Sequence, residues 1–179
     1  MASLLQQHFD RWKACEGCDA CQKRKRVVLI RGTVPAGVLF VGEAPGPSED
    51  VLGRPFVGPA GHLLDKIVEE ALEGRELAVA YTNLVACIPL DEAGKKFTEP
   101  PKTQIDACEG RLRECIELCQ PKLIVMVGKL AEKYIPALQR HVKTVAIVHP
   151  AAILRADISQ RGLAIKRTII TLRDAIGEL

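Results

Sequence analysis

Residues 38–65 constrain the fold of this chain more than any other stretch. The stretch begins with an apolar run, Val38–Val41, of the kind that a buried parallel strand shows. The run ends at Gly42-Glu43-Ala44-Pro45-Gly46, where glycine and proline stop regular structure. A second constrained segment, residues 53–58, leads into a helix that is expected from about Pro59. A strand, a rigid loop and a helix in this order predict an open α/β sheet with a site where its strands end.

The loop in this stretch carries one carboxylate, Glu43, and one aromatic side chain, Phe56. Both lie on backbone that has little freedom, which is typical of a small pocket for a flat ligand. The glycine spacing matches neither GxGxxG nor GxxxxGK[ST], so the main sequence signals for a nucleotide cofactor are missing.

The rest of the chain alternates between expected strands and expected helices. Core strands are expected at residues 77–86, 123–128 and 145–148, a short strand at 27–30, and helices at 3–13, 103–119, 130–138 and 165–176. Thr103 is the expected N-cap of its helix. This alternation predicts one domain over residues 1–179, of class α/β, built as a three-layer αβα sandwich around a mostly parallel four-stranded sheet.

Three polar residues each follow an expected core strand: Glu43, Asn83 and His149. Because the ends of parallel strands lie along one edge of a sheet, these side chains are expected to converge. Taken singly, each has a plainer interpretation: Asn83 as a turn residue, His149 as a loop histidine and Glu43 as an exposed carboxylate. From position alone these plainer interpretations stay open, and for Asn83 the turn is favoured.

The charge pattern bears on the partner. The net charge is only +3, but basic residues gather at 23–26, 95–96 and 161–167, as they would on a surface that contacts phosphates. Solvated basic faces explain any single cluster equally well. We see no apolar run long enough to span a bilayer and no signal peptide, so we expect a cytoplasmic protein without a membrane partner.

Seven cysteines in such a chain indicate reduced thiols or metal ligands rather than a disulfide framework. Two overlapping CxxC units are formed by Cys15, Cys18 and Cys21, and Cys87 and Cys108 follow later in the chain. Four thiolates suit a tetrahedral zinc or an iron–sulfur cluster, and their spacing does not separate the two. The remaining pair, at 115 and 119, is interpreted more simply as core thiols on one helix face.

The two loop motifs, GEAPGPSED at 42–50 and GRPFVGPAG at 53–61, resemble the first motif of the uracil-DNA glycosylase superfamily. The version with glutamate after the first glycine resembles the iron–sulfur group usually called family four. The similarity continues to HPAAILR at 149–155. It implies a monomeric DNA glycosylase that acts on DNA near the nucleoid, flips out uracil and excises it hydrolytically in base excision repair.

The resemblance also implies roles for individual residues. Phe56 would stack on the pyrimidine and Asn83 would bind its edge, while His149 would hydrogen-bond O2 and Glu43 would stabilise the cationic sugar or orient the attacking water. Base binding would involve Gly42 and Ala44 as well. The residues implied to contact DNA are Pro45, Gly58, Gly61, Leu154 and Arg155.

Members of this family carry a [4Fe–4S] cluster, which here implies the ligands Cys15, Cys18, Cys87 and Cys108. Counting back from Val27 places the first two in register and leaves Cys21 spare, although exchange of Cys21 for Cys15 stays open. Zinc is the second choice of cofactor.

The chain departs from the family pattern in three places. Ala86-Cys87-Ile88-Pro89 stands where relatives usually have Lys-Cys-Arg-Pro. The loop from 87 to 108 is longer than usual, and the segment between 138 and 145 is shorter. Two alternatives follow: the same scaffold acting on another deaminated or modified base, for example a modified cytosine in phage DNA, or a cluster-bearing DNA-binding module without catalysis. The presence of Glu43, Phe56, Asn83 and His149 together argues against the second.

Overall fold

The computed structural model describes residues 3–179. Its centre is a five-stranded sheet in the order β1-β3-β2-β4-β5. Four strands run parallel: β2 (Val38–Gly42), β3 (Val79–Asn83), β4 (Leu123–Val127) and β5 (Lys143–Ile147). The fifth, β1 (Arg31–Gly32), pairs antiparallel with the outer side of β3.

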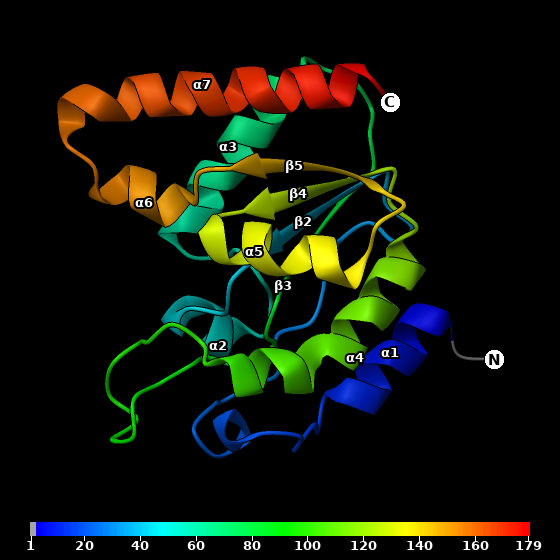
Figure 1. Cartoon of the computed structure of the whole chain (residues 1–179), viewed down its shortest axis with the longest axis vertical. Coiled ribbons are helices and arrows are strands. Elements are labelled where there is room, and N and C mark those ends of the chain that lie inside the picture. Colours follow the sequence, from blue (N-terminus) through cyan, green and yellow to red (C-terminus); the bar gives the residue numbers. More distant parts are fainter. Residues whose placement is uncertain (1–2) are drawn as a thin grey trace.

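Helices cover both faces of this sheet (Figure 1). One face is covered by α3 (Pro59–Leu72), α6 (Pro150–Arg155) and α7 (Ile158–Gly177), and the other by α1 (Leu4–Trp12), α4 (Lys102–Cys119) and α5 (Lys129–Leu138). A short helix, α2 (Pro47–Leu52), and a 3₁₀ turn, η1 (Asp19–Gln22), lie in the connections. The predicted αβα sandwich is confirmed. Among the helices of residues 3–179, none has the length and apolar character needed to cross a membrane.

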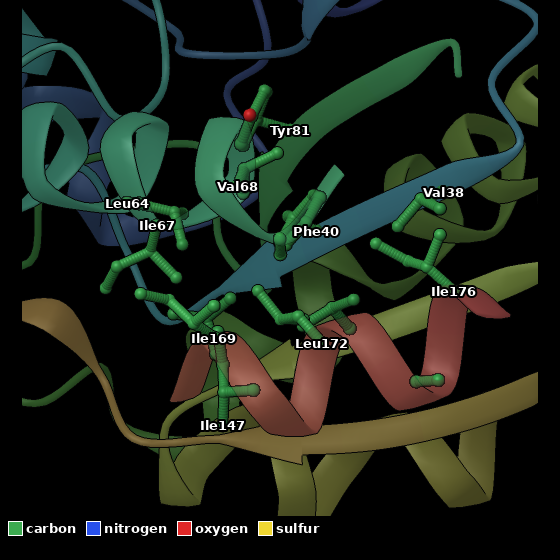
Figure 2. Packing of buried hydrophobic residues seen from close by; sticks show 14 of the residues in the cluster. Val38, Phe40, Leu64, Ile67, Val68, Tyr81, Ile147, Ile169, Leu172 and Ile176 are labelled. Atoms are coloured by element: carbon green, nitrogen blue, oxygen red, sulfur yellow. The ribbon is translucent and has the colours of Figure 1, made fainter. Parts of the chain in front are cut away.

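The central strand β2 shows why the sheet needs two helical layers. All five of its residues are buried. Val38 and Phe40 pack into the layer of α3 and α7, where Figure 2 shows them facing helix residues such as Leu172. Leu39 and Val41 point the opposite way, into a second core between the sheet and the layer of α1, α4 and α5. Successive side chains of a strand alternate between faces, so a continuous apolar run requires cover on both sides.

The prediction of four strands is corrected to five, and the strand expected at 27–30 is wrong. Residues 27–30 form no ladder, because Val28 donates one backbone hydrogen bond to Ala86 and the Leu29 carbonyl accepts from the Thr82 hydroxyl instead. The ladder begins one residue later, at β1. This segment therefore extends the sheet beside β3 with only two residues.

Two helix starts also differ from expectation. Pro101 is the N-cap of α4, which begins at Lys102, so Thr103 lies inside the helix and is not its cap. Helix α7 begins at Ile158 rather than at 165. Its first turns are largely solvent-exposed and carry no apolar stripe, so periodicity gives no signal there.

Two short helices, α2 and α6, lie where loops were expected. Each has proline at its first position, where the missing N–H is tolerated and φ is already helical. Glu49 supports the start of α2 by accepting a hydrogen bond from the Gly46 N–H at 3.1 Å. His149 is the N-cap of α6. Both helices thus begin at the carboxyl edge of the sheet, beside the predicted site.

Candidate active site and cysteine cavity

The carboxyl edge of the sheet holds a cavity of about 320 Å³, a size that suits one small ligand. Glu43 follows β2, Asn83 ends β3 and His149 follows β5, so three strands deliver their end residues to this cavity. The predicted site residues that line it are Glu43, Ala44, Phe56, Gly61, Asn83, His149 and Arg155. The structure brings these side chains together, and their individual roles stay predictions.

The other predicted contacts lie around the cavity rather than in its lining. Gly42, Pro45 and Gly58 are buried or nearly so in the backbone beneath it, and Leu154 is exposed on α6. Gly42 is needed for close packing, because a Cβ there would overlap Asn83 Oδ1 and lie 2.5 Å from Phe56 Cζ. The floor of the cavity can therefore form only on glycine at this position.

Phe56 sits in a strained backbone conformation. Its φ is +55°, in the left-handed region, and only 6% of the residue is exposed. Its ring centroid lies 5.9 Å from that of Tyr81 and 6.3 Å from that of His149. Such a conformation costs on the order of 1–3 kcal/mol and persists only where neighbours enforce it. Gly61 makes room for it, because a Cβ on Gly61 would collide with the Phe56 carbonyl.

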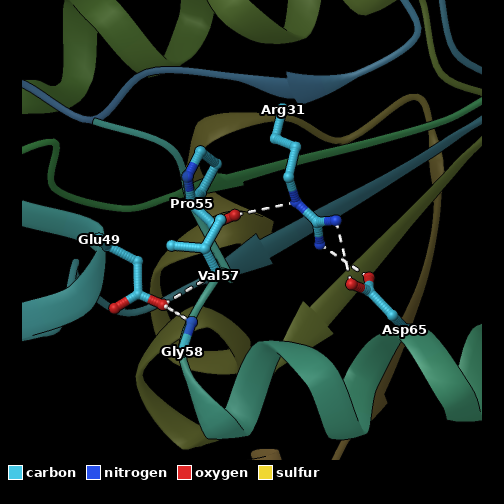
Figure 3. Close-up of polar contacts among 6 residues, drawn as sticks. All are labelled: Arg31, Glu49, Pro55, Val57, Gly58 and Asp65. Carbon is cyan, nitrogen blue, oxygen red and sulfur yellow. Dashed lines mark hydrogen bonds and ion pairs between the residues drawn. The ribbon is translucent and has the colours of Figure 1, made fainter. Parts of the chain in front are cut away.

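Arg31 fixes the loop that carries Phe56 (Figure 3). Its Nε donates to the carbonyl of Pro55 at 2.9 Å, and its two terminal nitrogens donate to the Asp65 carboxylate at 3.1 and 2.8 Å. The guanidinium also lies 4.0 Å from the centroid of the Tyr81 ring. Sequence reasoning missed Arg31, which lies on β1 far from the motif along the chain.

Glu49 fixes the other side of the same loop. Its Oε1 accepts from the backbone N–H groups of Val57 at 2.9 Å and Gly58 at 2.8 Å (Figure 3). Its Oε2 accepts from Gly46 N. One carboxylate therefore holds both halves of the motif together. Its place three residues after Gly46 is the spacing of a capping box, a signal that could have revealed it.

The surroundings of His149 disfavour its charged form and orient its ring. Its Nδ1 accepts a hydrogen bond from the Ala151 N–H at 3.1 Å. Burial lowers the pKa of His149, and the positive charge of Arg155 lowers it further, against a smaller opposing effect of Glu49. Because Nδ1 accepts, the proton of the neutral ring is assigned to Nε2. The ring can thus act as a hydrogen-bond donor without being charged.

Glu43 is half-buried, and burial raises its pKa. The negative charge of Glu99 raises the pKa further, and Arg155 acts in the opposite direction. A carboxylate in this setting is less well solvated than in water, which strengthens its interaction with any positive charge that develops nearby.

Phe97 is a lining residue that the sequence analysis missed. It is 50% exposed and reaches the cavity from the long loop after Cys87. A bridge between Leu90 and Phe97 makes this loop a hairpin, and Asp91 Oδ1 accepts from the backbone N–H of Lys95 at 2.7 Å. The signal was an aromatic residue in a polar loop of a chain with only 4% aromatics.

A second cavity lies beside α4, and the four cysteines predicted as ligands, Cys15, Cys18, Cys87 and Cys108, all line it. Cys21 is not among its lining residues. The pair at 115 and 119 is fully buried in the second core, so the interpretation of these residues as core thiols is confirmed.

Comparisons with known proteins place these two cavities in context. The family model described as the uracil DNA glycosylase superfamily matches residues 31–173. The chain belongs to the uracil DNA glycosylase superfamily.

Relatives named Type-4 uracil-DNA glycosylase are similar to it over most of its length. The protein of Sulfurisphaera tokodaii is 39% identical over 68% of this chain and 53% of its own length. The protein of Thermotoga maritima is 38% identical over 72% of this chain and 64% of its own. The protein of Archaeoglobus fulgidus is 32% identical over 79% of this chain and 78% of its own length. The chain thus spans little more than half the length of the first relative.

Four thiols line the cysteine cavity of this superfamily member. Within residues 3–179, no group of three or more His, Cys, Asp or Glu side chains is already arranged to hold one metal ion. Arg24 Nη1 and Arg111 Nε are buried without hydrogen-bond partners in the described chain, and both residues line the cavity. Two such cations suit an anionic thiolate cluster.

Proposed function

We propose that this protein excises uracil from DNA by hydrolysing the N-glycosidic bond. The observation that carries the proposal is the convergence of Glu43, Phe56, Asn83 and His149 in one cavity large enough for a single base. The names of the relatives support the same activity. Because a base inside a duplex is out of reach, the uracil nucleotide is flipped into the cavity.

Recognition of the base rests on a ring and an amide. Phe56, fixed by its strained backbone, offers the aromatic face on which a pyrimidine stacks. The side chain of Asn83 both donates and accepts, which matches the O4 and N3–H groups of uracil. Cytosine presents the opposite pattern at these atoms, so the amide discriminates between the two bases.

Bond cleavage rests on one donor and one carboxylate. As the N-glycosidic bond breaks, its electron pair moves to the base and negative charge builds on O2, where the Nε2–H of His149 stabilises it. Positive charge builds on the sugar, where the Glu43 carboxylate stabilises it or orients the attacking water. Water then adds to C1′ and its proton passes to solvent, which leaves an abasic site, and the released base anion takes up a proton from solvent to become uracil.

Contacts outside the cavity hold the opened strand. Leu154 and Arg155 lie at the end of α6 beside the cavity, where Leu154 enters the space left in the stack and Arg155 contacts phosphate. The backbone around Pro45, Gly58 and Gly61, near the start of α3, runs along the DNA strand. The protein acts as a monomer.

The cofactor proposed for the cysteine cavity is a [4Fe–4S] cluster bound by Cys15, Cys18, Cys87 and Cys108, a proposal supported by the four thiols that line it. When bound, it supplies a cross-link between the N-terminal segment, the segment after β3 and the start of α4. Zinc bound by the same four thiolates is the second choice.

The test uses duplex oligonucleotides that each carry one lesion: uracil, hypoxanthine, xanthine or a modified cytosine. After incubation, alkaline cleavage reports the abasic site. We expect cleavage at uracil and little at the others. Preferential cleavage at another base would replace uracil as the substrate, and cleavage at none would exclude a glycosylase.

A further inference from the structure

Arg111 is the largest fully buried polar side chain of the described residues, and its hydrogen bonds converge on the end of β3. The residue is 1% exposed and lies one turn after Cys108 in α4. Its Nη1 donates to Thr82 Oγ1 at 2.8 Å, and its Nη2 donates to the Asn83 carbonyl at 2.6 Å and the Leu84 carbonyl at 2.8 Å. One guanidinium thus holds the backbone carbonyls of Asn83 and Leu84 and the hydroxyl of Thr82 before them.

The same side chain faces the cysteine cavity. Arg111 lines that cavity, and its Nε has no hydrogen-bond partner within residues 3–179. No ion pair joins it to a carboxylate in this part of the chain, so its charge is compensated only by neutral oxygens. Burying a guanidinium in this way is costly unless another group neutralises it. Arg24 and Arg111 are the basic residues that line the cavity. The residues on either side of Cys87, Ala86 and Ile88, are apolar and add no positive charge.

We propose that Arg111 is a positioning residue that joins the two sites: it fixes Asn83 for base recognition and donates its Nε–H to the cysteine-bound cluster. The inference rests on the proposed function and deepens it. The Asn83 amide packs against Gly42 without spare room, so a shift of its backbone displaces the amide. A displacement of about 1 Å in a positioned group can lower a rate by roughly a hundredfold.

The effect of Arg111 on base recognition is tested by DNA binding rather than by turnover. Affinity is measured for DNA with an uncleavable 2′-fluoro-deoxyuridine and for the same DNA with thymidine at that position. Arg111→Lys keeps the charge but loses the planar fork that bonds two carbonyls and a hydroxyl. We expect the ratio of the two affinities to fall about tenfold, the size of one lost charged hydrogen bond, with affinity for thymidine DNA unchanged. Arg113→Lys, on the same helix but exposed and paired with Glu109, is the matched control.

A double-variant cycle separates positioning from general stability. If Arg111 acts through Asn83, Arg111→Lys combined with Asn83→Ala discriminates no worse than Asn83→Ala alone. Additive losses, or an unchanged ratio in Arg111→Lys, overturn this inference. A wild-type protein that does not distinguish the two DNAs overturns the proposed function instead.

The proposed contact of Arg111 with the cluster is tested by visible circular dichroism and iron content after anaerobic purification. We expect Arg111→Met to alter the visible bands at unchanged iron per chain, while Arg113→Met leaves them as in the wild type. If Arg111→Met does not fold, Arg111→Lys takes its place. Identical spectra, or a colourless wild-type protein, overturn this half of the inference.

Discussion

Gly42 and Asn83 are neighbours in the β2–β3 register, and the missing Cβ of Gly42 is what allows the Asn83 amide to lie against the sheet edge. The Phe56 ring uses the same space from the other side. Both residues of the proposed base pocket thus depend on one backbone position that carries no side chain itself.

Gly42→Ala is therefore expected to slow uracil excision strongly without unfolding the protein. The added methyl displaces Phe56 and Asn83, and misplacement on this scale lowers the rate by roughly a hundredfold or more. Single-turnover excision and thermal unfolding measure the two effects. Gly162→Ala, at a position in α7 with open space around it, controls for glycine replacement, and full activity in Gly42→Ala would contradict the packing argument.

His149→Ala is expected to slow bond cleavage while leaving base affinity nearly unchanged. In the proposed mechanism its Nε2–H stabilises charge that appears only in the transition state, and such a loss typically costs about 3 kcal/mol, on the order of a hundredfold in rate. Single-turnover excision and binding of the uncleavable analogue separate the two quantities. If the variant excises at the wild-type rate, another donor must stabilise O2.

Glu43 is expected to give excision an acidic limit. In the proposed mechanism the ionised carboxylate is the active form, so activity is expected above its pKa and is lost as the pH falls through it. Burial and Glu99 raise this pKa above 4.5, so the limit lies above pH 4.5. Glu99→Gln removes one cause and should move the limit to lower pH. Glu92→Gln, on the same loop, should not move it, and equal profiles for all three proteins would contradict the assignment.

Phe97→Ala is expected to weaken binding of DNA that carries the uncleavable analogue. Stacking of a base on an aromatic ring is worth about 1–3 kcal/mol, which corresponds to roughly 5- to 150-fold in affinity. Phe97→Tyr keeps the ring and should bind as the wild type does. Fluorescence anisotropy measures both, and equal affinity of the alanine variant would show that the hairpin makes no contact with the strand.

Cys21→Ala is expected to leave the cluster intact, and Cys18→Ala to remove it. Only the second residue lines the cysteine cavity. Iron analysis of anaerobically purified protein should give about four irons per chain for the wild type and for Cys21→Ala. Loss of iron from Cys21→Ala would show that Cys21 is a ligand, so that the second CxxC unit, Cys18 with Cys21, binds the cluster.

The parallel strands β2 and β4 were predictable because each is a short apolar run buried on both faces, and β3 and β5 were predictable from the apolar part of each. Their order in the chain also fixed which residues meet at the carboxyl edge, so the convergence of Glu43, Asn83 and His149 could be anticipated. Strand β1 could not, since Arg31 and Gly32 have no strand character and become a strand only by pairing with β3.

The residues that hold the site were harder to predict than those that line it. Arg31 contacts Pro55 and Asp65, which lie 24 and 34 positions further along the chain. Arg111 bonds to residues 27–29 positions before it. Their sequence neighbourhoods show only a basic residue beside a turn and a polar residue in a helix, and nothing local distinguishes them from solvated arginines.

The distribution of the cavity cysteines along the chain has a consequence for biosynthesis. Cys15 and Cys18 leave the ribosome first, while Cys108 follows after β3 and the long hairpin. At typical rates of synthesis, roughly 5–20 s pass between the synthesis of Cys15 and that of Cys108. During this interval the early pair is an open dithiol in a segment without its partner helix α4. Cells that make this protein under oxidative stress are therefore expected to lose it at the nascent stage, before any folded molecule exists to be damaged.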